Sequence, residues 1–272
     1  MTQSSSNFDA TSGDGYELQM GRFSRRLAGR FLDFTGVSDL GRILDAGCGT
    51  GALSAELLRR TQHASIAGVD IAPAYVAYAA STTTDDRIAF TVGNLEELTF
   101  ADGEFGQVFS QLVLNFVPRT DLAISELVRV TAPAGTVSAA IWDVRGGLLF
   151  NRLFFDTASV LDPAADAARG RNLTRPLTRP GTLAAAWEAA GLTDLRQGEV
   201  AIRMEYSSFD DYWAPCDGDD GPIAAYLKTV GQELRSRIKD AVRRAYLDGD
   251  EDGPRSYTAT AWVVKGTKPS GG

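Results

Sequence analysis

The stretch ILDAGCGTG, residues 43–51, combines two aliphatic residues, one carboxylate and three alternating glycines. Glycines at 47, 49 and 51 allow backbone conformations and close approaches that a Cβ atom would forbid. A β-rich run, RILDA, ends within this stretch, and a helix-like run, GALSAELLRR, begins at its last glycine. The pattern therefore predicts a strand, a tight turn and the start of a helix. In an open α/β sheet, ligands bind outside the carboxyl ends of the strands, so we expect this turn to lie against a ligand.

Asp45 narrows the choice of ligand. The dinucleotide-binding pattern G-x-G-x-x-G brings a helix N-terminus to a pyrophosphate. Here the spacing is G-x-G-x-G, and the Asp45 carboxylate, two residues before Gly47, would repel a pyrophosphate. A ligand with a cationic or amino-bearing group is the better match. Cys48 lies between two glycines, where a small side chain is required, and we expect it to be no nucleophile.

Short β-rich runs alternate with helical stretches through most of the chain, after an amphipathic helix with Phe23, Leu27, Phe31 and Phe34 on its apolar face. Strands are expected at 42–46, 65–70, 88–92, 106–112, 135–142, 199–205 and 257–264. Helices are expected after the first, second, fourth and fifth of these strands, the last of them near 179–192. Strands alternating with helices predict a parallel sheet covered on both faces. The expected fold class is α/β, a Rossmann-like, doubly wound and mostly parallel sheet of seven strands.

Three segments depart from that rhythm. Residues 1–15 are rich in Ser, Thr, Asp and Gly without any period, which predicts a disordered tail before a single domain at 16–272. Segments 145–177 and 207–254 fit neither element type. We expect both to be lid insertions over the functional edge of the sheet, since neither has the apolar content to form its own core.

Composition excludes several classes of protein. The chain has 272 residues, and its 27 Lys and Arg against 35 Asp and Glu give a formal charge of −8, which disfavours nucleic acid and anionic membranes as partners. Two cysteines and one histidine, His63, are too few for a disulfide framework or a protein zinc site, so no metal is expected. No targeting signal or membrane-spanning run is recognisable, which favours the cytoplasm.

The glycine-rich stretch resembles the first motif of the class I S-adenosylmethionine-dependent methyltransferases. GVDIA (68–72), VGNLEELTF (92–100) and VFSQLVLNFVP (108–118) resemble the later motifs of that family, in the expected order. The resemblance extends over residues 16–143 and is greatest for the small-molecule type 11 and quinone methyltransferases. The family usually has Asp where this chain has Asn94, whose amide oxygen can accept the same hydrogen bond.

The resemblance implies S-adenosylmethionine as the methyl donor. Asp70 would accept hydrogen bonds from the ribose diol, Asn94 would meet the adenine amino group, and Arg22 would reach the carboxylate of the donor. The implied donor-binding residues are Arg22, Asp45, Gly47, Cys48, Gly49, Gly51, Asp70, Ile71, Asn94, Leu95, Gln111 and Leu112.

The methyl acceptor would bind at the tips of the fourth and fifth strands and beneath the insertions. Candidate pocket residues are Asn115, Phe116, Trp142, Tyr212 and Trp213, whose aromatic members could stack on a flat acceptor or contact the sulfonium. Methyl transfer from a sulfonium requires alignment and exclusion of water more than a fixed catalytic triad. The expected acceptor is a small organic molecule, methylated on O, N or C, and the protein a monomer or homodimer. A protein that binds the donor without turnover, a nicotinamide-dependent oxidoreductase and an aminopropyltransferase are the alternatives.

Overall fold

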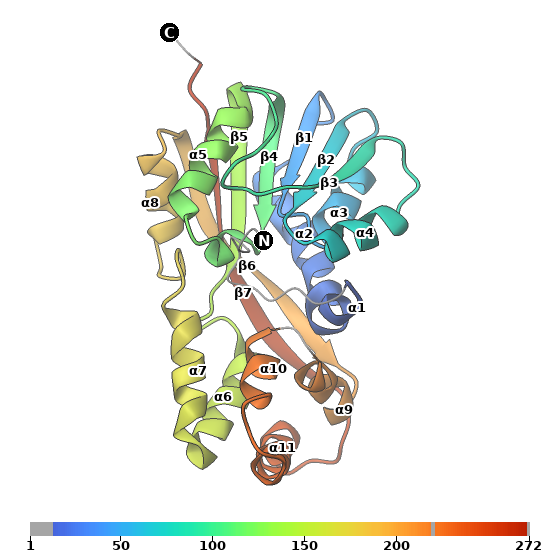
Figure 1. Ribbon diagram of the computed structural model, residues 1–272, viewed down its shortest axis with the longest axis vertical. Coiled ribbons are helices and arrows are strands. Elements are labelled where there is room, and N and C mark those ends of the chain that lie inside the picture. The colour runs from blue at the N-terminus through green and yellow to red at the C-terminus, as the bar shows by residue number, and fades with distance from the viewer. Residues whose placement is uncertain (1–12, 219–220, 271–272) are drawn as a thin grey trace.

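The computed structural model describes residues 13–218 and 221–270, which form one seven-stranded sheet flanked by helices (Figure 1). The strands, in chain order, are β1 (Arg42–Ala46), β2 (Ser65–Asp70), β3 (Ile88–Val92), β4 (Phe105–Gln111), β5 (Thr131–Trp142), β6 (Thr193–Tyr206) and β7 (Arg255–Thr267). Their order in the sheet is β3-β2-β1-β4-β5-β7-β6. Strands β1 to β5 are parallel, whereas β7 is antiparallel to both of its neighbours. The predicted fold class is therefore confirmed.

Both faces of the sheet are covered, as the burial of four consecutive residues of β1 requires. The flanking helices are α2 (Arg22–Thr35), α3 (Ala52–Arg60), α4 (Pro73–Ser81), α5 (Thr120–Val130) and α8 (Thr182–Ala189). Ile43 packs in one cluster with buried side chains of α2 and α3, and its neighbour Leu44 packs in another with those of α5 and α8. Successive strand residues point to opposite faces of the sheet, so the full burial of both neighbours means that helices cover both faces at this point.

The N-terminal helices begin earlier than the sequence predicts. Residues 13–15 belong to α1 (Gly13–Tyr16), which continues through a π-helical turn, η1 (Glu17–Gly21), into α2. The expectation of a disordered tail is therefore wrong for these three residues, and its remainder, residues 1–12, lies outside the described part of the chain. The Oγ1 of Thr50 donates a hydrogen bond of 2.6 Å to the Glu17 carboxylate, which ties this N-terminal segment to the glycine-rich turn.

Strands β6 and β7 continue past the end of β5 and reach the helices of the two insertions (Figure 1). The last residue of β5, Trp142, pairs with Ala261, while the β6–β7 ladder runs on to Tyr206 and Arg255. At about 3.3 Å per residue this projection is about 20 Å long. It supports α6 (Leu149–Leu161), α7 (Pro163–Leu173), α9 (Phe209–Trp213), α10 (Gly221–Leu227) and α11 (Gln232–Leu247), with the short 3₁₀ turn η3 (Ala214–Asp217) between α9 and α10.

The two insertions share one apolar core, which we call the lid core. Its buried members come from both insertions and from the projecting parts of β6 and β7: Phe154, Phe155, Met204, Tyr206, Phe209, Tyr212, Trp213, Tyr226, Ile238, Val242, Tyr246 and Ala259. Neither insertion forms this cluster alone, because side chains of each fill the space left by the other. The segments that the sequence leaves unassigned thus become ordered together on the β6–β7 platform. Among the described residues, no helix is both long and apolar enough to cross a membrane.

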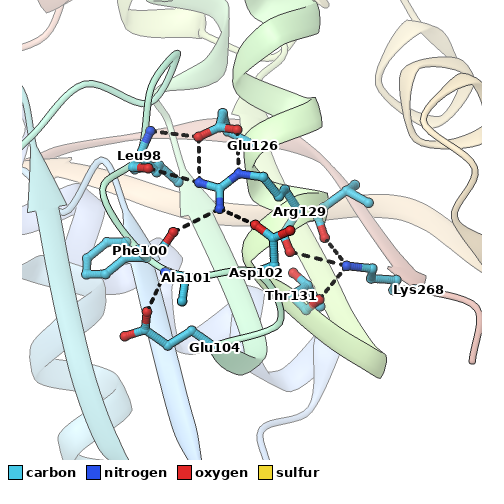
Figure 2. A network of polar contacts seen from close by, with 10 residues as sticks. Leu98, Phe100, Ala101, Asp102, Glu104, Glu126, Arg129, Thr131 and Lys268 are labelled. Carbon is cyan, nitrogen blue, oxygen red and sulfur yellow. Dashed lines mark hydrogen bonds and ion pairs between the residues drawn. The ribbon is translucent and has the colours of Figure 1, made fainter. Parts of the chain in front are cut away.

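A polar network lies near the amino ends of β4 and β5, at the end of the sheet away from the insertions (Figure 2). The guanidinium of Arg129 on α5 donates hydrogen bonds to the backbone carbonyls of Leu98 and Phe100 and to the carboxylates of Asp102 and Glu126, at 2.7–2.9 Å. These contacts fix the loop between β3 and β4 against α5. In the same region, the ammonium of Lys268 donates hydrogen bonds to the backbone carbonyls of residues 128, 129 and 131. These bonds join the segment after β7 to the end of α5 and the start of β5.

Replacing Arg129 with methionine keeps a long side chain but removes every donor. We expect the free energy of unfolding to fall by about 1–3 kcal/mol, because the carbonyls of Leu98 and Phe100 and the Glu126 carboxylate lose their partner. Urea unfolding followed by circular dichroism measures this. Arg59→Met is the matched control, since the ion pair of Arg59 lies on an exposed helix face, and its expected change is below about 0.5 kcal/mol. Equal losses in the two variants would contradict the role of the network.

Candidate functional site

A cavity of about 1320 Å³ lies at the carboxyl ends of the parallel strands, between the sheet and the lid helices. Ligand cavities in proteins usually measure about 300–1000 Å³, so this one has room for a nucleoside-sized molecule together with a second, smaller one. The strand ends contribute Asp45, Gly47, Cys48, Gly49, Asp70, Ile71, Asn94, Leu95, Gln111, Leu112, Asn115, Phe116 and Trp142 to its lining. Tyr16, Gln19 and Met20 line it from the N-terminal helices, and Phe150, Asn151, Asn172, Arg175, Pro222, Ala225 and Lys228 from the lid.

The glycine-rich turn presents main chain to this cavity. The N–H groups of Gly47 and Cys48 both donate to the carbonyl of Val69 at the end of β2, at 2.7 and 3.0 Å. Gly47 has a φ of +79°, and a Cβ atom there would collide with the side chain of Val113. The turn therefore requires glycine for two independent reasons. Gly51, by contrast, caps α3 and does not line the cavity.

Asp45 is a buried carboxylate with one unsatisfied oxygen. Its Oδ2 accepts a 2.6 Å hydrogen bond from the hydroxyl of Ser54, whereas Oδ1 is buried without a partner among the described residues. Burial raises the pKa of Asp45 to about 7, and the nearby carboxylate of Asp70 raises this pKa further while Ser54 lowers it. A buried carboxylate oxygen aimed at a ligand cavity is suited to a cationic ligand group.

Asp70 closes the other side of the same turn. Its Oδ2 accepts from the N–H of Gly49 and its Oδ1 from the N–H of Ala72, each at 2.9 Å. Burial raises the pKa of Asp70 in spite of these two hydrogen bonds. Each carboxylate oxygen can accept a second hydrogen bond, so Asp70 can still accept from a hydroxyl in the cavity. Burial also raises the pKa of the Cys48 thiol, which disfavours the reactive thiolate.

Strands β3 and β4 supply the next part of the lining. The Oδ1 of Asn94 accepts a 3.0 Å hydrogen bond from the N–H of Glu96, which shapes the turn after β3. The Nε2 of Gln111 donates at 3.0 Å to the carbonyl of Ser24 on α2. Leu112 follows with a φ of +63°, a conformation that is costly for a side chain with a Cβ atom and that concentrates at functional sites.

Several buried polar atoms of the lining have no protein partner. Among the described residues, the side chains concerned are those of Asp45 (Oδ1), Gln111 (Oε1), Asn115 (Oδ1), Trp142 (Nε1) and Arg175 (Nη1). Buried polar groups are nearly always hydrogen-bonded in folded proteins, so a cluster of unsatisfied ones around one cavity marks a ligand site. Asn115, on the 3₁₀ turn η2 (Leu114–Phe116), and Trp142, at the end of β5, lie where the sequence places them.

Besides Gly51, three candidate residues lie outside the cavity lining. The guanidinium of Arg22 pairs with the carboxylate of Asp211 at 2.9 Å and does not line the cavity, which corrects the expectation that it reaches a bound ligand. Tyr212 and Trp213 are also absent from the lining, because both are buried in the lid core. The hydroxyl of Tyr212 donates at 2.8 Å to the carbonyl of Phe150, so its polar atom serves to join two lid segments.

No pattern in the sequence points to the lining residues that come from α1, η1 and the lid. Tyr16 packs its ring against that of Tyr75, with centroids 5.3 Å apart, and so brings the N-terminal segment over the cavity. Asn172 lies in the last turn of α7, and Arg175 lies two residues beyond that helix. The sequence of α7 carries no motif and little apolar periodicity. The one histidine, His63, is exposed and lies outside the lining, and no group of three or more metal-ligating side chains occurs within 13–218 and 221–270.

Fold and cavity together define a Rossmann-like α/β protein with a ligand site at the carboxyl edge of its sheet. Residues 44–139 match the methyltransferase domain family. The chain is 28% identical over 215 residues to a malonyl-[acyl-carrier protein] O-methyltransferase of Erwinia pyrifoliae, a match that covers 72% of this chain and 80% of that protein. It is 32% identical over 161 residues to a demethylmenaquinone methyltransferase of Beutenbergia cavernae, which covers 59% of this chain and 64% of that protein.

Solved structures show the same fold. A phosphoethanolamine N-methyltransferase of Haemonchus contortus, in complex with S-adenosyl-L-methionine, superposes with a TM-score of 0.57 at 15% identity, covering 96% of this chain and 60% of that one. The family match over residues 44–139 and the curated relatives support a methyltransferase domain in this chain, and the solved structure shows the shared fold.

The raised pKa of Asp45 predicts a pH-dependent stability. A carboxyl group with a pKa of about 7 in the fold and about 3.9 in the unfolded chain stabilises fully below the lower value, and this contribution is lost as the pH rises through the higher one. Asp45→Asn removes the dependence. We therefore expect the variant to gain stability relative to the wild type between pH 4.5 and pH 8, measured by urea unfolding of the ligand-free protein.

Asp39→Asn is the control for this experiment. Backbone N–H groups of His63, Gln62 and Ala64 donate to the Asp39 carboxylate and lower its pKa, so its stabilising contribution is lost only as the pH falls below about 4. The stability difference between Asp39→Asn and the wild type should stay constant over the same pH range. A constant difference for Asp45→Asn as well would contradict the raised pKa of Asp45.

Proposed function

We propose that this methyltransferase binds S-adenosylmethionine at the strand-end side of the cavity and methylates a small organic acceptor at the lid side. The observation that carries the proposal is the pairing of a main-chain turn with two buried carboxylates, Asp45 and Asp70, in one lining. This set fits a ligand that has an amino group and a ribose but no pyrophosphate. When bound, the donor supplies an activated methyl group and a good leaving group.

The residues present fit the amino acid and nucleoside parts of that donor. The unpartnered Oδ1 of Asp45 is suited to an ammonium group, and the remaining lone pairs of Asp70 to the two hydroxyls of a ribose. Asn94 and Leu95, after β3, lie in the lining where an adenine would be held. Ile71 and Leu112, in the same lining, offer apolar contacts to the bound donor. Arg22 has no part in this proposal, because it is paired with Asp211.

The acceptor side has no obvious general base. His63 is exposed and outside the lining. Burial raises the pKa of Tyr16 to about 12, which makes its phenol a poor proton acceptor at neutral pH. The residues of this side therefore orient the acceptor and exclude water, and proximity of that kind can supply about 7–11 kcal/mol of a barrier. An acceptor atom that is nucleophilic without loss of a proton suits this cavity best.

The curated relatives support a small acceptor without naming it. Two of them are named for malonyl-[acyl-carrier protein] and for demethylmenaquinone, which are chemically different acceptors. A donor-binding protein without turnover and a nicotinamide-dependent oxidoreductase are the alternatives, and Asp45 speaks against the second because a pyrophosphate would meet a buried carboxylate.

Titration calorimetry with S-adenosylhomocysteine, the demethylated donor, tests the donor site. We expect micromolar binding to the wild type and at least about tenfold weaker binding to Asp70→Ala, since hydrogen bonds to a charged acceptor are lost. Asp86→Ala, which removes an exposed carboxylate outside the lining, should bind like the wild type. Circular dichroism and melting temperature establish that each variant folds. Tight binding of NAD in place of S-adenosylhomocysteine would overturn the proposal.

The acceptor can be found with a labelled donor. Purified enzyme, supplied with S-adenosylmethionine carrying a labelled methyl group and with a metabolite extract, should transfer the label to a small molecule that mass spectrometry identifies. Asp70→Ala should form the same product more slowly, and heat-denatured enzyme none. Binding of the donor with no labelled product from any extract would favour the alternative of a donor-binding protein without turnover.

A further inference from the structure

The two sides of the cavity carry opposite charge. Asp45 and Asp70 lie at the ends of β1 and β2, whereas the charged side chains that line the cavity from the lid are Arg175 and Lys228. No Asp or Glu other than those two belongs to the described lining. The carboxylates are assigned above to the methyl donor, so the described lid side of the lining contains basic side chains and no carboxylate.

Arg175 lies two residues beyond α7 and has no anionic partner. It forms none of the ion pairs found among residues 13–218 and 221–270, and its Nη1 is buried without a hydrogen-bond acceptor. Its guanidinium stacks on the ring of Phe116, with Cζ 4.2 Å from the ring centroid. Burial lowers the pKa of Arg175, and no carboxylate offsets this effect. An arginine nevertheless stays protonated at neutral pH, so this charge is partly desolvated and uncompensated.

Two other arginines of the lid, in contrast, form ion pairs with carboxylates. Arg169, on the same helix, pairs with Asp156 and Asp166 at 2.6 and 2.5 Å. Arg235 of α11 pairs with Asp217 at 2.7 Å. Arg175 is the one lid arginine in the described cavity lining, and it has no such partner. Partial burial of an unpaired charge costs free energy, and a ligand of opposite charge would recover it.

We infer that Arg175 binds an oxyanion of the methyl acceptor, a carboxylate or a phosphate, and that the enzyme therefore methylates an anionic small molecule. The inference rests on the proposed donor site, because it assigns only the lid side of the cavity. The planar guanidinium, which lies over the ring of Phe116, offers parallel N–H donors that match two oxygens of such a group. Asn115 and the indole N–H of Trp142, both unpartnered in the same lining, provide further polar contacts to the acceptor.

Binding of simple anions to the complex with S-adenosylhomocysteine tests this inference. Hexanoate and inorganic phosphate are titrated separately, with hexanamide as the uncharged match of hexanoate, and tryptophan fluorescence reports binding because Trp142 lies in the lining. We expect saturable binding of at least one anion, at least about tenfold tighter than that of hexanamide, weakened by added salt. The tighter of the two anions indicates whether the natural group is a carboxylate or a phosphate.

Three variants assign the effect to Arg175. Arg175→Gln should weaken the preferred anion at least about tenfold, and Arg175→Lys should retain part of the affinity because it keeps the charge. Arg171→Gln is the matched control, since Arg171 is an exposed residue of α7, four positions before Arg175 and outside the lining, and it should bind like the wild type. All variants should bind S-adenosylhomocysteine normally and melt at similar temperatures.

The inference and the donor site fail in different ways. Loss of S-adenosylhomocysteine binding in the wild type would overturn the proposed function itself. A wild type that binds S-adenosylhomocysteine but neither anion, or that binds hexanamide as well as hexanoate, would overturn the inference alone. Equal weakening in Arg175→Gln and Arg171→Gln would also overturn it, because a general loss of positive charge would then account for the effect.

Discussion

The ladder between β6 and β7 is the constraint on which the rest of the structure depends. Its projection beyond β5 gives the two insertions a surface to pack on, and the isolated bridge between Leu148 and Ala259 joins the first insertion directly to it. Arg26 of α2 donates at 2.7 Å to the carbonyl of Arg203, which covers part of the outer edge of the projection. Without this platform the lid core would lose one wall, and the cavity would be an open crevice along the sheet.

The cavity has two halves that arise by different means. The half at the strand ends, where we propose that the donor binds, follows from local sequence, because its residues lie in short segments at the ends of successive strands. The lid half follows from contacts between segments far apart in the chain: Arg175, after α7, meets Phe116, after β4. A local motif constrains the first half strongly, while the second half is free to differ between proteins that share the fold.

This difference sets what could be predicted from the sequence. The strands and α2 follow from periodicity, and the strand-end lining from four short motifs, each at the end of a strand. Helix α7 was missed because its buried face consists of Ala165 and Ala168, which leave no large apolar period. Tyr212 and Trp213 are predicted in the pocket because they lie in a polar stretch of sequence, yet both rings are buried in the lid core while their neighbour Asp211 pairs with Arg22. No pattern in the sequence marks Arg175, since its significance lies in the ion pair that it lacks.

The unsatisfied polar atoms explain why such a cavity is costly to maintain. Oδ1 of Asp45, Nε1 of Trp142 and Nη1 of Arg175 are withdrawn from bulk water without protein partners, and each lowers the stability of the ligand-free fold. The large apolar clusters on both faces of the sheet and in the lid offset that cost. Because these atoms come from β1, β5 and the lid, the ligands that satisfy all of them must between them contact both the sheet and the lid. Ligand binding is thereby coupled to the packing of the lid against the sheet.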